Sequence, residues 1–383
     1  MTWVSGCFVS LVSSALIAAT TALPRPVLAA SPAEGASESK GRAAMIAGAH
    51  VWEPTPVPKM DLRTGPDGPG SFPPGATVSC EYRDIKLKGR SPKFVCALGD
   101  GDEVKVKYGG TNGEVYGEVA ATRLLWALGF GADRMYPVRI ICRGCPREFG
   151  GIERQNGDLI VAPAVIERKF PGKEYSEKEG WKWNELDIVA DKQTLAERDA
   201  LKLLAVLVQH TDNKAVQQRL LCRDERAEAG KAEGCRRPFM MVSDLGLTFG
   251  KASLSNANSK SGMNLTDWVR TPIWKDEKGG EEPQICVGNL PKSFSGTLDD
   301  PVISEDGRRF LAGLLEQLTD KQLHDLFEVA QVNLRTRTPN DPLSGMASVS
   351  EWVDAFKAKR DEIVNRRCAA EGSRPKVTTT TKR

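Results

Sequence analysis

The stretch HTDNKAVQ occupies residues 210–217, directly after a long apolar run, and DLG occupies residues 244–246, after a second apolar run. The first stretch contains Asp212, with an amide side chain, Gln217, five positions later. The second begins with Asp244 and ends in a glycine, which lets the backbone turn tightly. Two carboxylates and an amide at this spacing suit a site where one aspartate accepts a hydroxyl proton and the other groups hold a hard dication. The pattern therefore predicts phosphoryl transfer.

Each polar side chain of these stretches has a predicted role. Asp212 orients or deprotonates the attacking hydroxyl, and His210 belongs to the same catalytic loop. Asp244 and Gln217 hold magnesium, with manganese as the alternative metal. Protein kinases carry an asparagine where this chain has Gln217, one methylene longer, so the neighbouring Gln218 is an alternative ligand. Taken singly, Asp212 also suits a turn that closes a helix, and Asp244 a turn at a strand end.

The composition is that of an ordinary globular protein. The chain has 383 residues, of which 40% are hydrophobic and 27% charged, which suffices for one large core or for two lobes with a cleft between them. The net charge of +3 arises from 53 basic and 50 acidic residues. This balance favours neither nucleic acid nor an anionic membrane as a partner, and we expect no nucleic-acid partner.

The first 29 residues are predicted to be a signal peptide. Residues 2–23 carry no charge and centre on an apolar run, and residues 27–29 supply the small-residue pattern of a cleavage site. No lysine or arginine precedes the run, so a retained membrane anchor is the alternative. In either case the body leaves the cytosol. We expect an extracytoplasmic protein, periplasmic or secreted, with no stable membrane span after signal cleavage.

The cysteines agree with an oxidising compartment. Without Cys7 of the signal peptide, the chain keeps eight cysteines, an even number. Cys80 and Cys96 flank one predicted strand pair, and Cys222 and Cys235 flank a polar loop between two predicted short strands, so each pair is a candidate disulfide. The motif CRGC at residues 142–145 suits a redox pair or half of a zinc site, but no second Cys/His pair has suitable spacing. A structural disulfide or two separate bridges is the preferred interpretation.

The first half of the body is predicted to be rich in strands. After a Pro/Gly-rich leader or strap, residues 30–75, strands are expected at residues 78–82, 93–98, 103–108, 134–142 and 159–168. Lys105 and Lys107 share one face of the third strand, where one can reach a phosphate; a solvated strand face is the alternative. The helix that follows carries Glu118, our choice to hold Lys107, and Glu114 as the second candidate. Either glutamate also suits a helix start.

The second half is predicted to be mostly helical around two strands. A capping box at Thr194 opens the helix that leads to the first stretch, and the strands are expected at residues 219–222 and 239–243. Helices are expected at residues 304–318, 319–331 and 348–365, the last two with capping boxes at Thr319 and Ser348. Residues 371–383 are expected to be a disordered basic tail.

The order of these parts resembles the HipA-like branch of the protein-kinase-like and lipid-kinase-like fold, and a set of exported bacterial proteins of that type. The residues that carry the resemblance are KGRSPKF at 88–94 in place of a Gly-rich loop, Lys107, Glu118, HTD at 210–212 and DLG at 244–246. The resemblance covers roughly residues 80–250. It implies that the loop covers the phosphates of ATP, so that Ser91 and Lys93 join Lys107 as nucleotide-binding residues.

These observations predict an α+β, two-lobed, protein-kinase-like fold. A small β-rich N-lobe with one helix would span residues 76–168, and a larger, mostly helical C-lobe residues 169–370. The leading hypothesis is an exported ATP/Mg-dependent phosphotransferase that acts on a protein or a small hydroxyl acceptor. The alternatives are a catalytically inactive pseudokinase that serves as a binding module, and an enzyme that transfers the nucleotide rather than the phosphate.

Overall fold

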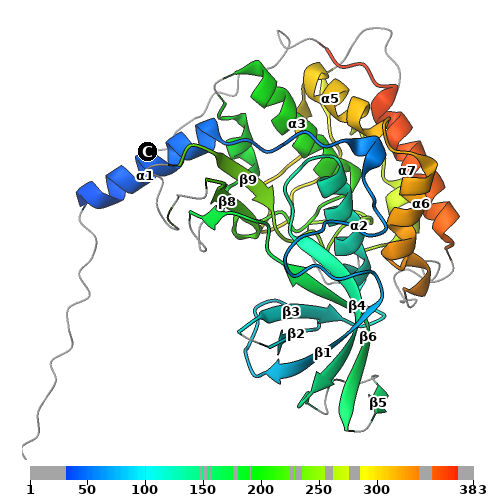
Figure 1. Ribbon diagram of the computed structural model, residues 1–383. Coiled ribbons are helices and arrows are strands. Elements are labelled where there is room, and N and C mark those ends of the chain that lie inside the picture. The colour runs from blue at the N-terminus through cyan, green and yellow to red at the C-terminus, as the bar shows by residue number, and fades with distance from the viewer. Residues whose placement is uncertain are drawn as a thin grey trace, which may run out of the picture.

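The computed structural model describes residues 32–99, 101–146, 149, 153–155, 157–175, 180–189, 191–224, 228, 235–254, 262–275, 285–335 and 347–369. The predicted signal peptide, residues 1–29, and the predicted basic tail, residues 371–383, lie outside the described residues. The described part is a mixed α+β structure, in which a sheet-rich region lies below a larger, mostly helical region in the view of Figure 1.

One sheet of six strands organises the first half of the body. Its strands are β1 (Ala76–Arg83), β2 (Lys93–Ala97), β3 (Glu103–Tyr108), β4 (Arg134–Arg143), β5 (Glu153–Gln155) and β6 (Asp158–Arg168), in the order β3-β2-β1-β4-β6-β5. The pair β1–β4 is parallel, and the other pairs are antiparallel. Because β3 also pairs with β6, each of the strands β1, β2, β3 and β4 has a partner on both sides. The five longer strands predicted from the sequence are present, with bounds that differ by a few residues.

The helix α2 (Gly113–Ala127) follows β3 and runs through the middle of the protein (Figure 1). Its N-cap is Asn112, whose side chain accepts a hydrogen bond from the backbone of Glu114, 3.2 Å away. All of its residues except Trp126 are buried, and the buried set includes its charged side chains. A helix that is buried on every side can carry carboxylates only where cations or hydrogen-bond donors lie next to them.

A three-stranded sheet and most of the helices form the second half. The sheet has the order β7-β8-β9, from β7 (Lys173–Glu174), β8 (Gln218–Cys222) and β9 (Pro238–Val242). The helices are α3 (Lys192–Leu207), α4 (Leu265–Arg270), α5 (Glu305–Leu315), α6 (Asp320–Val329) and α7 (Val349–Val364), and a small pair, β10 (Cys286–Val287) with β11 (Val302–Ile303), precedes α5. Short 3-10 turns lie at Val57–Lys59, Trp183–Asp187, Ala215–Gln217 and Val332–Leu334.

The helix starts follow from capping side chains. The predicted capping boxes at Thr319 and Ser348 are present and open α6 and α7. At α3 the predicted cap, Thr194, is wrong. Asp191 takes that position, because its carboxylate accepts hydrogen bonds from both the backbone and the hydroxyl of Thr194, at 2.8 and 2.7 Å.

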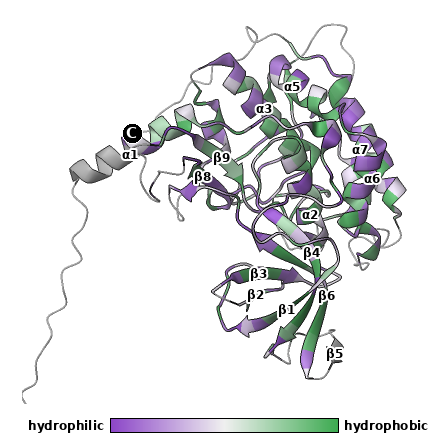
Figure 2. Ribbon diagram, in the orientation of Figure 1, coloured by the Kyte–Doolittle hydropathy of each residue, from purple (hydrophilic) through white to green (hydrophobic). Residues whose placement is uncertain are grey.

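The helices pack through aromatic side chains. Trp268 of α4 stacks on Trp352 of α7, with 5.8 Å between ring centroids, and Phe327 of α6 stacks on Trp352 at 5.7 Å. Figure 2 shows the outer helices α6 and α7 with both hydrophilic and hydrophobic residues, as expected for helices with one face on the core. This aromatic cluster belongs to the main core, which also takes in α2 and α3.

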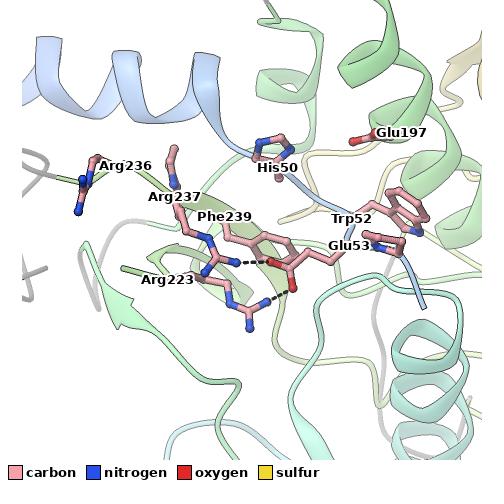
Figure 3. A pocket seen from close by; sticks show the side chains of 10 residues that line it. His50, Trp52, Glu53, Glu197, Arg223, Arg236, Arg237 and Phe239 are labelled. Carbon is pink, nitrogen blue, oxygen red and sulfur yellow. Dashed lines mark hydrogen bonds and ion pairs between the residues drawn. The ribbon is translucent and has the colours of Figure 1, made fainter. Parts of the chain in front are cut away.

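The leader segment is part of the folded body. Residues 32–48 form a helix, α1 (Pro32–Gly48), and Met45, Ile46 and Val51 are buried in the main core. The strap after α1 is attached where Glu53 lies between Arg223 and Arg237, beside a cavity of about 330 Å³ (Figure 3). The sequence of this segment, rich in small and polar residues, gave no signal for α1.

Four disulfides link cysteines within the described residues, two in the first half of the body and two in the second. They are Cys80–Cys96, Cys142–Cys145, Cys222–Cys235 and Cys286–Cys368. The first and third confirm the predicted brackets, and the second shows that CRGC forms a single short bridge. Such a set is compatible with an extracytoplasmic protein. Within the described ranges, no helix is long and apolar enough to cross a bilayer.

Candidate functional site

A buried ion pair joins β3 to α2. The ammonium nitrogen of Lys107 lies 2.5 Å from Oε1 of Glu118, and both side chains are only 1% exposed. Burial disfavours the ammonium, but the negative charges of Asp244, Glu118 and Glu114 outweigh it, so the pKa of Lys107 is raised well above its ordinary value. Lys107 is therefore a permanent cation. Lys107 of the strand and Glu118 of the helix, the two residues predicted to pair, are thus in contact.

A second carboxylate of α2 also reaches the lysine. Oε2 of Glu114 lies 3.1 Å from the Lys107 ammonium, and Oε1 of Glu114 accepts a hydrogen bond from the hydroxyl of Ser91. Glu114 and Glu118 are one turn apart on the buried helix, so both side chains reach the same cation. The two candidates named from the sequence thus act together, and Glu114 also links the lysine to the loop that carries Ser91.

The third carboxylate comes from the loop after β9. Oδ1 of Asp244 lies 3.6 Å from the Lys107 ammonium and accepts a hydrogen bond from the backbone of Gly246, 3.3 Å away. The side chain of Asp244 is 30% exposed, so it lies at the open edge of the cluster. The charge of Lys107 outweighs burial and holds the pKa of Asp244 well below its ordinary value. Asp244 is therefore a permanent anion.

Three glycines let α2 and this loop touch. A Cβ atom at Gly246 would lie 2.5 Å from Glu114, and a Cβ at Gly117 would lie 2.8 Å from the carbonyl oxygen of Gly246. A Cβ at Gly262 would lie 2.9 Å from the same oxygen. Only glycine permits backbone contacts this close. Gly246, the third residue of DLG, is therefore required by the close packing against α2 as well as by the turn.

Gln217 bridges the two aspartates. Its Nε2 donates to Oδ2 of Asp212 at 2.9 Å and to Oδ2 of Asp244 at 2.8 Å. Asp212 also lies 3.3 Å from the ammonium of Lys214. The two stretches that opened the sequence analysis thus meet in space, and Gln217 joins them. Successive contacts therefore run from Asp212 to the Gln217 amide, from the amide to Asp244, and from Asp244 to Lys107.

Asp212, Gln217 and Asp244 carry oxygen atoms of the kind that a hard dication takes as ligands. Oε1 of Gln217 is buried and has no hydrogen-bond partner in the described part of the chain, which is costly for an amide oxygen. Rotation of the amide by half a turn would aim this oxygen at the space between the carboxylates, an arrangement that suits a cation there. No cluster of three or more His, Cys, Asp or Glu side chains suited to a metal occurs among the described residues. Magnesium bound here would take further oxygens from phosphate and water, as is usual for it.

The loop before β2 supplies two more polar groups. A Cβ at Gly89 would lie 2.6 Å from the ammonium of Lys93, so this lysine folds back beneath the loop. Burial and then the nearby charge of Lys107 lower the pKa of Lys93. Two ammonium groups that disfavour each other across this space would both gain from a bound anion. Ser91 and Lys93 thus both belong to the surroundings of Lys107, the first through Glu114 and the second through its charge.

His210 has surroundings of a different kind. Its side chain is fully buried, its ring centroid lies 6.0 Å from that of Trp183, and neither ring nitrogen has a hydrogen-bond partner among the described residues. Burial lowers its pKa to about 4, so the ring is neutral at pH 7. The structure places the ring of His210 in the packing next to Trp183, and the backbone carbonyl of His210 accepts a hydrogen bond from Asn213.

Asn213 is a site residue that the sequence analysis missed. It is fully buried, its Nδ2 donates to the carbonyl of His210, and its Oδ1 accepts from the backbones of Thr297 and Leu298 at 2.9 and 3.1 Å. The amide thus fixes the loop of Asp212 to the segment before β11. Its place directly after Asp212 was the available signal, but an Asp-Asn pair also suits an ordinary turn.

Comparisons with known proteins give little beyond this geometry. No family model matches the chain, and no curated protein matches it. Among solved structures, the proinflammatory kinase CtkA of Helicobacter pylori is similar, with 10% identity over 76% of this chain and 97% of that chain. The TM-score is 0.38, a level at which a likeness carries no argument about activity.

Proposed function

We propose that this protein is a phosphotransferase that uses a nucleoside triphosphate, ATP in the first instance, with magnesium. One observation carries the proposal: Lys107 is buried among Glu118, Glu114 and Asp244, while Gln217 links Asp244 to Asp212. A buried lysine kept charged by carboxylates, two loop aspartates and an amide are the groups that phosphoryl transfer requires. We include in this proposal that the fold is two-lobed and kinase-like.

Each residue then has a role. The Lys107 ammonium neutralises phosphate oxygens, with Glu118 fixing its position, and Ser91 and Lys93 bind the phosphates from the loop above. Asp244 and Gln217 hold magnesium, or manganese, which when bound neutralises charge on the phosphates. His210 supports the loop of Asp212 through packing.

The chemical step assigns Asp212 the proton. The acceptor hydroxyl oxygen forms a bond to the γ-phosphorus as the bond from that phosphorus to the bridging oxygen breaks. The hydroxyl proton passes to the Asp212 carboxylate, and the nucleoside diphosphate leaves with the bonding electron pair. The acceptor is a hydroxyl on a protein or on a small molecule. Attack on the α-phosphorus by the same groups would transfer the nucleotide instead.

The export of the protein forms part of the proposal. The four disulfides support an extracytoplasmic location, together with the signal peptide predicted from the sequence. An enzyme there needs a supply of nucleotide outside the cytosol. The rival function is a pseudokinase that binds a partner without catalysis, and Gln217 in place of asparagine is the observation that favours it.

Thermal unfolding with ligands tests the proposal. The mature, disulfide-intact protein is heated with ATP or GTP, each with and without magnesium or manganese, beside Asp244→Asn and Lys107→Met. A ligand that binds only the native state raises the melting temperature, by an amount that grows with its concentration. We expect a metal-dependent rise that both variants lose.

Two matched controls separate site effects from general ones. Asp354→Asn on α7 and Lys173→Met on β7 change exposed residues of the same types and should keep the full rise. Transfer of labelled γ-phosphate to a hydroxyl acceptor would then separate the enzyme from the pseudokinase. Absence of a shift with every nucleotide and metal would remove the enzyme proposal.

A further inference from the structure

A basic cavity lies where the end of α7 meets the start of α5, and it shares no residue with the site of Lys107. Its volume is about 490 Å³. It is lined by four arginines and one carboxylate, together with uncharged residues: Arg308, Arg309, Arg366, Arg367, Glu305, Val364, Asn365 and Cys368. The lining therefore has an excess of three positive charges. A cluster of like charges around a hollow is costly unless an anion occupies it.

The single carboxylate of the cavity is already saturated. Glu305 accepts hydrogen bonds from Arg308 at 2.9 and 2.8 Å, from Arg309 at 2.8 Å and from the backbone of Cys368 at 3.0 Å. Burial opposes ionisation of Glu305, but these donors outweigh it and lower its pKa to about 2. Glu305 is therefore fully ionised at pH 7, yet it has no remaining capacity to neutralise the other guanidinium groups.

Two arginines remain available to a ligand. Arg309 is 71% exposed, and among the described residues its only partner is Glu305, reached through Nε. Arg367 is exposed and has no ion-pair or hydrogen-bond partner in the described part of the chain. Arg308 differs, because its side chain is 8% exposed and it also donates to the carbonyls of Ile363 and Val364. Arg308 thus forms the floor of the cavity, and Arg309 and Arg367 its open side.

Covalent and packing contacts fix the segment after α7, which lines one side of the cavity. Cys368 forms the disulfide with Cys286, 82 positions earlier, which ties this segment to β10. The guanidinium of Arg366 lies over the ring of Trp274, 5.6 Å from its centroid. The backbone of the cavity is therefore held before any ligand arrives, which lowers the entropy that binding costs.

We propose that this cavity binds a small oxyanion with more than one negative charge, of the phosphate or sulfate class. Guanidinium groups match the geometry of phosphate and sulfate oxygens through paired N–H donors, and they remain charged at every accessible pH. An excess of three charges favours an anion of two or more charges over a single carboxylate. The site is independent of the proposed catalytic function, because none of its residues contacts the Lys107 cluster.

Calorimetric titration with inorganic pyrophosphate tests the proposal. The protein is titrated at pH 7.5 and constant ionic strength, since salt screens exposed charges. The test variant is Arg309→Ala with Arg367→Ala, and the control is Arg139→Ala with Arg143→Ala, which removes two exposed arginines from β4. We expect saturable binding in the native protein, and a loss of affinity of roughly tenfold per arginine removed in the test variant only.

A second background distinguishes this site from the nucleotide site. In Lys107→Met the pyrophosphate site of the cavity should persist unchanged, even if that variant abolishes all nucleotide binding. Titration with inorganic phosphate and sulfate ranks the anions. Absence of saturable binding in the native protein, equal affinity in the arginine test variant, or an equal loss in the β4 control would each overturn the proposal.

Discussion

The carboxylate of Glu114 lies between two donors from different parts of the chain: one oxygen accepts from the hydroxyl of Ser91, and the other lies 3.1 Å from the ammonium of Lys107. The loop of Ser91 is thereby tied to the buried lysine through Glu114. A phosphate that binds Lys107 must share these donors with Glu114.

The Ser91 hydroxyl is expected to matter both to the free protein and to nucleotide binding. Ser91→Ala removes one charge-assisted hydrogen bond, so we expect a loss of about 1–2 kcal/mol in the free energy of unfolding without nucleotide. The ATP-induced rise in melting temperature should also shrink, because a phosphate donor is lost. Denaturant unfolding and melting with ATP measure the two effects, with Ser71→Ala, an exposed serine of the strap, as the control. Unchanged values of both quantities would contradict this role.

The Lys107–Glu118 pair is expected to be costly to break but cheaper to replace. Glu118→Leu leaves a buried ammonium with fewer partners, so we expect a loss of about 3 kcal/mol or more in the free energy of unfolding. Lys107→Met combined with Glu118→Leu removes both charges, and we expect it to be more stable than Glu118→Leu alone.

Urea unfolding of the two single variants and the double variant gives the coupling free energy between these side chains. We expect the coupling to exceed about 1 kcal/mol, because the two groups are in direct contact. Glu103→Leu, at an exposed position of β3, is the matched control. Additive effects of the two substitutions would show that the pair does not act as a unit.

Gln217 is expected to set the metal requirement. Gln217→Ala removes the amide that joins Asp212 to Asp244, and we expect the magnesium concentration for half of the ATP-dependent thermal shift to rise by about 10- to 100-fold. Gln217→Asn restores an amide and should recover part of the loss. Val216→Ala changes the exposed neighbour and serves as the control. A metal requirement that is identical in all four proteins would exclude Gln217 from the metal site.

The carboxylate of Glu305 is expected to make the protein sensitive to acid. Burial opposes its ionisation, but hydrogen bonds from Arg308, Cys368 and Arg309 lower its pKa from 4.5 to about 2. Because the folded-state pKa lies below the unfolded one, its contribution to stability is fully present above about pH 4.5 and is lost as the pH falls towards 2.

Comparison with Glu305→Gln isolates this contribution. Urea unfolding at pH 6, 4 and 3 should show that the free-energy difference between the native protein and the variant narrows as the pH falls. Glu316→Gln, at the end of the same helix and exposed, should keep a constant difference. A constant gap for Glu305→Gln as well would assign its effect to packing alone.

The sequence was informative where charged residues lie in or shortly after elements with a clear apolar pattern. Lys107 and Glu118 lie within β3 and α2, Asp212 and Asp244 lie in loops after α3 and β9, and the structure brings these elements together. The choice between Glu118 and Glu114 was not resolvable, because residues one turn apart face the same way and both reach the lysine. The strands were predictable because apolar and polar residues alternate along them.

Other features depend on contacts between distant segments and leave no local pattern. The helix α1 has no capping or apolar signal strong enough to predict it, and it packs through Met45 and Ile46 near its end. The basic cavity combines residues 305–309 with residues 364–368, which the Cys286–Cys368 bridge holds near β10. Cysteine spacing did not identify that bridge, because its partners are far apart in the chain.

The contact between Gly117 and Gly246 means that α2 and the loop of Asp244 share one surface with no room for a methyl group. Alanine at position 117 would act as a wedge between the helix that positions Lys107 and the loop that carries Asp244. The helix and the loop cannot move closer together, and moving them apart would open a void between them. This backbone contact therefore fixes how far Asp244 lies from Lys107, so the separation of the two charges is set by main-chain packing.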